Sequence, residues 1–158
     1  MGIPIYSTTV SPEWIDYNGH MRDGYYGLVL SLASDAMMDR VGMHADYRQR
    51  THCTLYTLEQ HLHFLHEVML GDRLDVELRI LAVDAKRIHA AFEIRCARHP
   101  DAVASGEQML LHVRQAVRPA SAPFPEDIAV AIEALRQQSA PGPAPALGSR
   151  RMELRPAR

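Results

Sequence analysis

The sequence predicts a single α+β domain in which an antiparallel sheet wraps around one long helix. Two patterns support this prediction. Residues 24–41 are apolar around most of a helical circumference, and from residue 51 to residue 117 the hydrophobic period changes to two. A helix with so few polar positions must be surrounded by protein, and successive strands joined by short turns provide the surrounding sheet. The length of 158 residues and the 47% hydrophobic content are sufficient for one core.

The first predicted elements are a short strand at residues 6–10 and the long helix at residues 24–41. Ser11-Pro12 ends the strand, Asp23 is the expected N-cap of the helix, and Gly42 is its expected stop. The few polar side chains of the helix fall mainly on one line at i, i+4 spacing. They are Ser31, Asp35 and Asp39, with Ser34 beside them.

Four strands are then expected, beginning near Thr51 and separated by turns at residues 70–72, 83–85 and 99–101; the last covers residues 105–117. In the first of them two different faces alternate. One face carries Tyr56, Leu58, Leu62 and Phe64, and the other carries Thr57, Glu59, His61 and His63. Because its second face is polar, we expect this strand to meet another subunit.

The predicted domain organisation has three parts. Residues 1–118 form the main domain, residues 119–138 comprise a linker and an amphipathic surface helix at residues 126–138, and residues 139–158 form a Pro/Ala-rich, basic tail that we expect to be mobile. The sequence contains no internal repeat.

Composition excludes several classes of function. A formal net charge of −2 does not favour binding to nucleic acid or to a membrane surface. The longest apolar run, residues 28–38, is too short to span a bilayer, and the N-terminus lacks the pattern of a signal peptide. Cys53 and Cys96 lie far apart without a C-x-x-C spacing, so we expect two reduced, buried thiols and a cytoplasmic protein.

The most informative segment is the polar loop that leads into the long helix. Asp16, Asn18, Gly19 and His20 lie within five residues of one another, just before the helix. The first N–H groups of a helix have no intrahelical partner, so this loop brings a carboxylate close to unpaired donors. A carboxylate beside such an oxyanion site can attack an ester or a thioester.

Four motifs carry a resemblance to a known family. They are Asp16-Tyr17-Asn18-Gly19-His20-Met21, Thr57-Leu58-Glu59, Asp84-Ala85-Lys86-Arg87-Ile88-His89 and Glu107-Gln108-Met109-Leu110-Leu111-His112-Val113. With this order of elements, residues 11–117 resemble the hotdog-fold acyl-CoA thioesterases of the 4-hydroxybenzoyl-CoA thioesterase type. The last two motifs and the Pro/Ala-rich end are more narrowly similar to betainyl-CoA thioesterases and to the thioesterase domain fused to carnitine dehydrogenases.

The resemblance implies a stand-alone thioester hydrolase, active as a homodimer or homotetramer on a short polar or cationic acyl-CoA, with betainyl-CoA the specific expectation. No metal or organic cofactor is implied. Asp16 would be the nucleophile or the general base that activates water, and backbone N–H groups around His20 and the helix start would hold the thioester oxygen. We expect desolvation against Trp14 and Tyr17 to raise the pKa of Asp16 above its usual value of about 3.9.

Three further residues are candidate catalytic groups, each with a simpler alternative. Asn18 orients water or substrate, or is an ordinary turn residue. His20 takes part in catalysis, or only closes the loop. Glu59 reaches a neighbouring subunit's active site, or is a solvated strand carboxylate.

Two groups of residues are candidate substrate contacts. Aromatic faces can hold a quaternary ammonium by cation–π attraction, or they can simply pack the helix start; this group is Trp14, Tyr17, Tyr25 and Tyr26. Lys86 and Arg87, at a turn, suit the phosphates of coenzyme A, or are solvated surface charges. The tail arginines could do the same. They are Arg150, Arg151, Arg155 and Arg158.

Other functions stay open at this point. His61 and His63 have the H-x-H spacing of metal ligands and His66 follows, but no third ligand motif is recognisable, and interface or surface histidines are the favoured interpretation. A hotdog hydratase or dehydratase, or a non-catalytic acyl-CoA-binding regulator, would also bind acyl-CoA.

Overall fold

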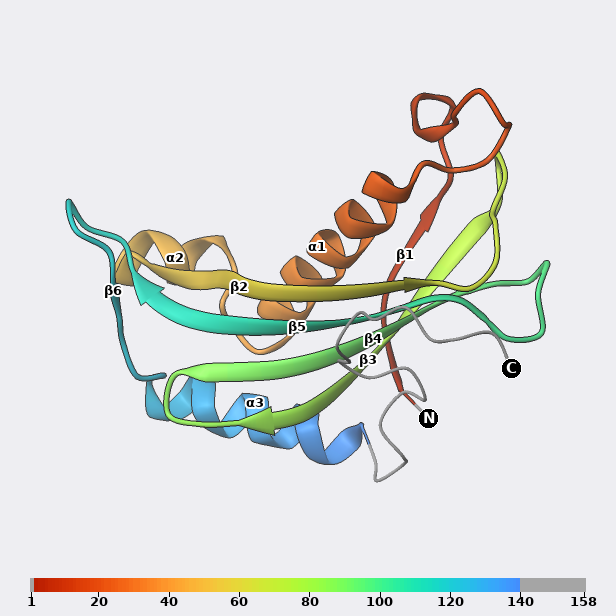
Figure 1. Cartoon of the computed structure of the whole chain (residues 1–158). Helices are drawn as coiled ribbons and strands as arrows, with labels where there is room; N and C mark the ends of the chain where they lie inside the picture. The colour runs from red at the N-terminus through yellow and green to blue at the C-terminus, as the bar shows by residue number, and fades with distance from the viewer. Residues whose placement is uncertain (1, 140–158) are drawn as a thin grey trace, which may run out of the picture.

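The computed structural model describes residues 2–139 as a curled antiparallel sheet with one long helix, α1 (Asp23–Arg40), lying across one face (Figure 1). The order of the strands is β1-β3-β4-β5-β2. Their bounds are β1 Ile3–Thr9, β2 Cys53–Phe64, β3 Arg73–Val83, β4 Arg87–Cys96 and β5 Ala102–Arg114. This arrangement confirms the predicted hotdog fold, with four long consecutive strands around a central helix.

One side of α1 forms the centre of the core. Val29, Leu30 and Met37 are fully buried on that side and face strand residues such as Phe92. Burying each such side chain contributes about 1.5–3 kcal/mol. The opposite side stays open: Leu28 is 41% exposed, and Ser31 and Asp35 are exposed as well. The expectation that protein surrounds α1 is therefore met on one side only within a single chain.

Several element boundaries differ from the prediction. β1 begins three residues earlier than expected, because Pro4 is tolerated on an edge strand. Asp23 is the first residue of α1 and not its N-cap; the cap position belongs to Arg22, which makes no side-chain capping bond. The last long strand, predicted at residues 105–117, lies three residues earlier, as β5 (Ala102–Arg114).

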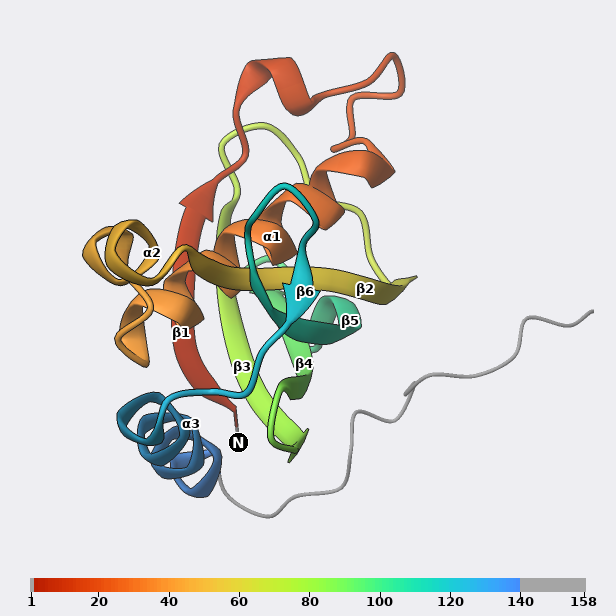
Figure 2. The same ribbon diagram turned by 90° about the vertical axis from the view of Figure 1, so that its left-hand side faces the viewer.

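Three short elements were not predicted: a 3-10 turn at Pro12–Trp14, helix α2 (Ala45–Thr51) and the two-residue strand β6 (Ala120–Ser121). The helix α3 (Glu126–Gln138) has the predicted bounds, and it packs against β3 near the N-terminal end of β1 (Figure 2). Its apolar face joins the core through Ile128, Ile132 and Leu135. Most of the predicted tail lies outside the described residues.

A β-bulge in β2 changes which side chains share a face. Thr57 is opposite Leu110 and Glu59 is opposite Met109, so Leu58 is an extra residue in this strand. Because the alternation restarts at the bulge, Thr57 lies on the α1 face whereas Glu59 lies on the outer face, the face turned away from α1. The prediction that Thr57 and Glu59 share a face is wrong.

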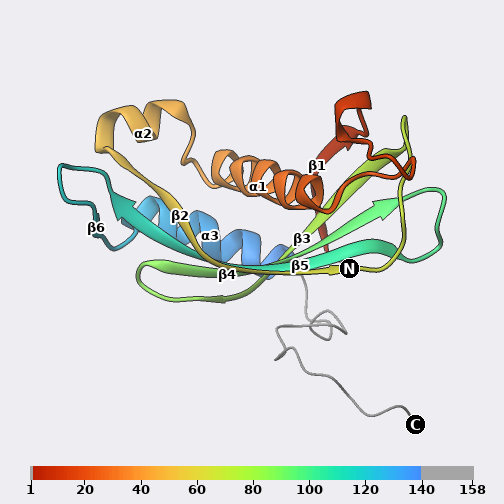
Figure 3. The same cartoon turned by 45° about the horizontal axis from the view of Figure 1, so that its top comes forward.

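The sheet leaves β2 at one edge, next to the open side of α1 (Figure 3). Leu58 and Phe64 of this strand are 57% and 54% exposed. Cys53 and Cys96 are free and buried, as predicted. None of the helices within residues 2–139 is long and apolar enough to cross a membrane.

Candidate functional site

The loop at residues 16–20 is a closed turn. The Asp16 N–H donates to the His20 carbonyl at 2.9 Å, and the Gly19 N–H donates to the Asp16 carbonyl at 3.1 Å. Gly19 has φ +80°, a left-handed conformation that glycine adopts without strain. The Met21 N–H donates to the Val68 carbonyl at 2.9 Å, so the loop is attached to the segment that follows β2.

This turn holds the Asp16 carboxylate in place. Its Oδ1 accepts hydrogen bonds from the backbone N–H groups of Asn18 at 2.8 Å and His20 at 3.3 Å, and its Oδ2 accepts one from Asn18 Nδ2 at 3.3 Å. Desolvation raises the pKa of Asp16, but these hydrogen bonds together outweigh it and leave the pKa below its usual value. The predicted rise in the pKa of Asp16 is therefore wrong, because the loop itself solvates the charge.

A cleft of about 350 Å³ opens beside this carboxylate. Its walls come from the loop, from the first turn of α1 and from the end of β2. The lining residues are Asp16, His20, Met21, Asp23, Tyr26, Phe64, Leu65, His66 and Glu67. As the first helical residue, Asp23 has no intrahelical acceptor for its N–H, so the start of α1 offers a free backbone donor on a residue that lines the cleft.

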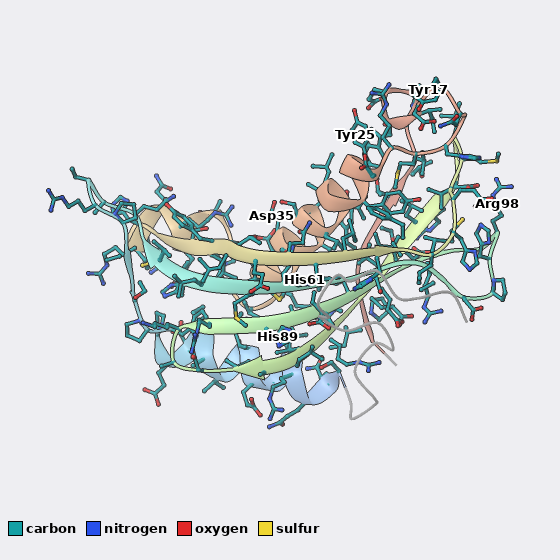
Figure 4. All side chains as sticks on the ribbon, in the orientation of Figure 1. Tyr17, Tyr25, Asp35, His61, His89 and Arg98 are labelled. Atoms are coloured by element: carbon teal, nitrogen blue, oxygen red, sulfur yellow. The ribbon has the colours of Figure 1, made fainter. Side chains whose placement is uncertain are left out.

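The structure separates the predicted aromatic cluster. Tyr26 lines the cleft, with its ring edge-to-face against Phe64 at a centroid distance of 5.2 Å. Trp14 is buried and stacks on Tyr25 at 5.4 Å, so these two rings pack the start of α1. Tyr17 is 94% exposed and lies at the tip of the loop, above Tyr25 (Figure 4).

Six lining residues were not predicted as site residues: Met21, Asp23, Phe64, Leu65, His66 and Glu67. The last four lie more than forty positions after Asp16 along the chain. They reach the cleft because His20 pairs with Met69 in an isolated β-bridge. The apolar end of β2 was visible in the sequence, but no local signal shows which loop it meets.

Glu59 does not line this cleft. On the outer face its Oε1 lies 2.6 Å from His61 Nε2, and a second pair joins His89 Nε2 to Glu107 Oε2 at 2.8 Å. The two pairs border an outer-face hollow of about 200 Å³, where Figure 4 labels His61 and His89.

Lys86 and Arg87 lie at the turn between β3 and β4, at the end of the sheet far from the Asp16 loop (Figure 1). Arg87 forms an ion pair with Asp84 at 2.6 Å, which, with backbone donors, lowers the pKa of Asp84 to about 2. Lys86 Nζ lies 3.2 Å from Ser121 Oγ. Within one chain the structure therefore keeps these cations away from Asp16. The tail arginines lie outside the described residues.

The histidines considered as metal ligands do not gather. His61 pairs with Glu59, whereas His66 stacks on His99 with a centroid distance of 4.6 Å. Among residues 2–139, no three His, Cys, Asp or Glu side chains are placed to hold a metal ion together.

Comparison with known proteins places this geometry in context. The family model of the thioesterase-like superfamily matches residues 10–132. A betainyl-CoA thioesterase of Pseudomonas aeruginosa is 42% identical over 153 residues, which cover 97% of this chain and 96% of that protein. An L-carnitine dehydrogenase/betainyl-CoA thioesterase of Agrobacterium fabrum is 43% identical over 109 residues, 69% of this chain but only 22% of that longer protein.

Two solved structures have the same fold as this chain. A crystal structure of a thioesterase candidate from Pseudomonas putida KT2440 superposes with a TM-score of 0.85 at 38% identity, covering 99% of both chains. The protein SAV2348 from Staphylococcus aureus, solved in complex with CoA, superposes with a TM-score of 0.86 at 27% identity and 98% coverage of both chains.

Proposed function

Because the chain belongs to the thioesterase-like superfamily, we propose that it hydrolyses betainyl-CoA to betaine and coenzyme A. The observation that carries the proposal is the Asp16 carboxylate, held by its loop beside a cleft that the N-terminus of α1 also reaches. The near full-length similarity to a betainyl-CoA thioesterase supports the choice of acyl group.

The hydrogen bonds that lower the pKa of Asp16 keep it ionised at neutral pH. The carboxylate then has two possible roles. It attacks the thioester carbonyl carbon to form an anhydride that water opens, or it takes a proton from a water molecule that attacks the same carbon. In both routes the C–S bond breaks, the thiolate of coenzyme A leaves and is protonated, and water supplies the oxygen of the product acid.

The supporting groups have distinct roles in this proposal. The N–H of Asp23, the first residue of α1, stabilises the negative charge that develops on the thioester oxygen, because the Gly24 N–H already donates to Asp23 Oδ1. Asn18 fixes the carboxylate by two hydrogen bonds, and the His20 N–H provides a third. We therefore assign Asn18 and His20 to the positioning of Asp16.

We further propose that two chains pair along β2 into a homodimer. The outer edge of β2 is unpaired within the described chain, and Leu58 and Leu28 expose apolar surface beside it. Antiparallel pairing of β2 with its own copy satisfies this edge by a twofold axis near the middle of the strand.

This pairing brings together groups that one chain keeps apart. The Cys53 end of β2 lies at the same end of the sheet as Arg87, and the Phe64 end lies at the cleft. Antiparallel pairing puts the Cys53 end of one chain beside the Phe64 end of the other. Arg87 of the partner subunit then lies at the cleft end of the paired sheet, three strands from this chain's β2 at about 4.8 Å per strand, and its long side chain can extend toward the phosphates of a bound CoA.

The test is free-thiol release from betainyl-CoA by the wild type and by Asp16→Asn. We expect the variant to lose hydrolysis by on the order of 10²–10⁴-fold while still binding the substrate, because the amide is neither a base nor a nucleophile. Unchanged turnover in Asp16→Asn would contradict the proposal. A change in acyl unsaturation without thiol release would instead indicate a hydratase or dehydratase, and binding without either reaction would indicate a non-catalytic acyl-CoA-binding protein.

A further inference from the structure

We propose that Glu67, together with the Tyr26–Phe64 ring pair, forms the part of the cleft that selects a positively charged acyl end. The inference rests on the proposed function and adds to it which residues determine specificity. It follows from the shape of the cleft, the orientation of two rings and the distribution of charge along the lining.

The aromatic part of the subsite is fixed in place. The buried Tyr26 ring meets Phe64 at 5.2 Å and an interplanar angle of 81°, and the Tyr26 hydroxyl donates to the His66 carbonyl at 3.4 Å. Phe64 is 54% exposed and lines the cleft. A quaternary ammonium group has no N–H to donate, so an aromatic surface is a better contact for its methyl groups than a hydrogen-bond acceptor would be.

The cleft lining contains several acidic side chains but neither of the strongly basic residue types. Three carboxylates face the cleft, Asp16, Asp23 and Glu67, and no lysine or arginine is among the lining residues. Asp16 is held by its loop, and Asp23 Oδ1 accepts a hydrogen bond from the Gly24 N–H at 2.8 Å. A neutral acyl group does not require such a lining, and the phosphates of coenzyme A would be repelled by it.

Glu67 is the carboxylate best placed for recognition without a part in the chemistry. Its own backbone N–H, with nearby histidines, lowers its pKa, so the side chain is ionised at neutral pH. It does not share the Asp16 loop, and it lines the cleft directly after Phe64, Leu65 and His66 in the chain. An acyl end that contacts Phe64 therefore lies close to the carboxylate of Glu67.

The segment that carries Glu67 is rigidly supported. The N–H groups of Leu65 and His66 both donate to the Val103 carbonyl at 3.0 Å, and His99 Nε2 lies 3.0 Å from the Glu67 carbonyl. Because these bonds hold the backbone of the segment, ligand binding does not have to order this part of the chain.

The experiment compares two substrates of the same shape. Betainyl-CoA carries a trimethylammonium group, and 3,3-dimethylbutanoyl-CoA carries a neutral tert-butyl group in its place. We expect Glu67→Gln to lower kcat/KM for betainyl-CoA by about tenfold and to leave kcat/KM for the neutral isostere unchanged, since only the charged substrate gains from the carboxylate. Glu13→Gln is the matched control, because it removes an exposed carboxylate on the preceding turn, outside the cleft lining. In this variant we expect no change in the ratio of kcat/KM for betainyl-CoA to kcat/KM for the neutral isostere.

Phe64→Leu tests the ring separately, because it keeps apolar volume but removes the aromatic face, and should also lower the ratio. Equal losses on both substrates in Glu67→Gln, or an unchanged ratio in both variants, would overturn the inference while leaving hydrolysis of betainyl-CoA by the wild type intact. Failure of the wild type to hydrolyse betainyl-CoA would count against the proposed function itself.

Discussion

The cleft at the Phe64 end of the sheet and the turns at the opposite end differ in charge, and the difference matches the two halves of the proposed substrate. At the Phe64 end the cleft is lined by three carboxylates and by no lysine or arginine. At the opposite end, the turns around β3–β4 and β5–β6 carry exposed cations (Figure 1). These are Lys86, Arg87, Arg114 and Arg118. A substrate with a cationic acyl end and an anionic nucleotide end fits both regions only if a second chain brings the basic end of one subunit to the acidic end of the other.

The largest effect is expected from breaking the pairing that joins the two ends. Leu58→Arg puts a charge near the middle of β2, where two copies of the same residue meet across the proposed twofold axis. We expect monomers in analytical ultracentrifugation and a loss of activity on the order of a hundredfold, because the site then lacks its CoA-binding half.

Leu70→Arg is the matched control for this change. Leu70 is also 57% exposed, but it lies in the turn before β3, away from the β2 edge. A Leu58→Arg protein that stays dimeric would contradict the proposed pairing of β2 at this residue, and a fully active monomer would show that one chain contains the whole site.

The second-largest effect is expected from removing a cation at the basic end, which tests that end separately from the acidic cleft. Arg87→Gln removes one cation and breaks its ion pair with Asp84. We expect KM for betainyl-CoA to rise by roughly tenfold, with a weaker dependence of KM on salt and little change in kcat, since a phosphate contact binds the ground state and the transition state alike. The ratio between betainyl-CoA and its neutral isostere should not change. A change in that ratio would mean that the two ends do not bind separate halves of the substrate.

The long strands and α3 could be predicted from the sequence, but the bulge in β2 and the shortest elements could not. Alternation gave the four long strands, and the apolar spacing of residues 126–138 gave the bounds of α3. The bulge at Leu58 could not be predicted, because a period of two does not report one inserted residue in a strand with few apolar side chains on either face. α2 and β6 are too short for a periodic signal.

The candidate site, too, could be predicted only in part. The loop around Asp16 was recognisable because its residues are consecutive. Phe64 and Glu67 were not, because only the long-range bridge between His20 and Met69 brings their segment to the loop. The direction of the pKa shift of Asp16 was predicted wrongly, since the hydrogen bonds from Asn18 and His20 depend on the backbone of the turn and cannot be inferred from the neighbouring aromatic residues.

A third prediction concerns pH at the acidic end. Because the pKa of Asp16 is lowered, the carboxylate is ionised above its usual value near 3.9, and activity should fall only as the pH drops through the lower, folded-state pKa. The rate for betainyl-CoA, whose ammonium does not titrate, should show no acid limb from Asp16 between pH 8 and pH 5. Asn18→Ala removes the Nδ2 donor, so its acid limb should move to higher pH. A wild-type limb near pH 6 would contradict the ionised state proposed for Asp16.

The smallest effect is expected at Glu59, which distinguishes the cleft from the outer-face hollow. Its carboxylate is hydrogen-bonded to His61 on the face turned away from α1, so Glu59→Gln changes an exposed pair and not a group of the cleft. Exposed pairs contribute about 0.2–1 kcal/mol, so we expect a small loss of stability and kcat/KM within roughly twofold of wild type. Glu107→Gln is the companion change on the same face, where the carboxylate is buried beside His89, and its larger cost should appear in thermal unfolding rather than in catalysis. A hundredfold loss of kcat in Glu59→Gln, with the dimer intact, would instead place Glu59 in a neighbouring subunit's active site and move part of the chemistry to the outer face.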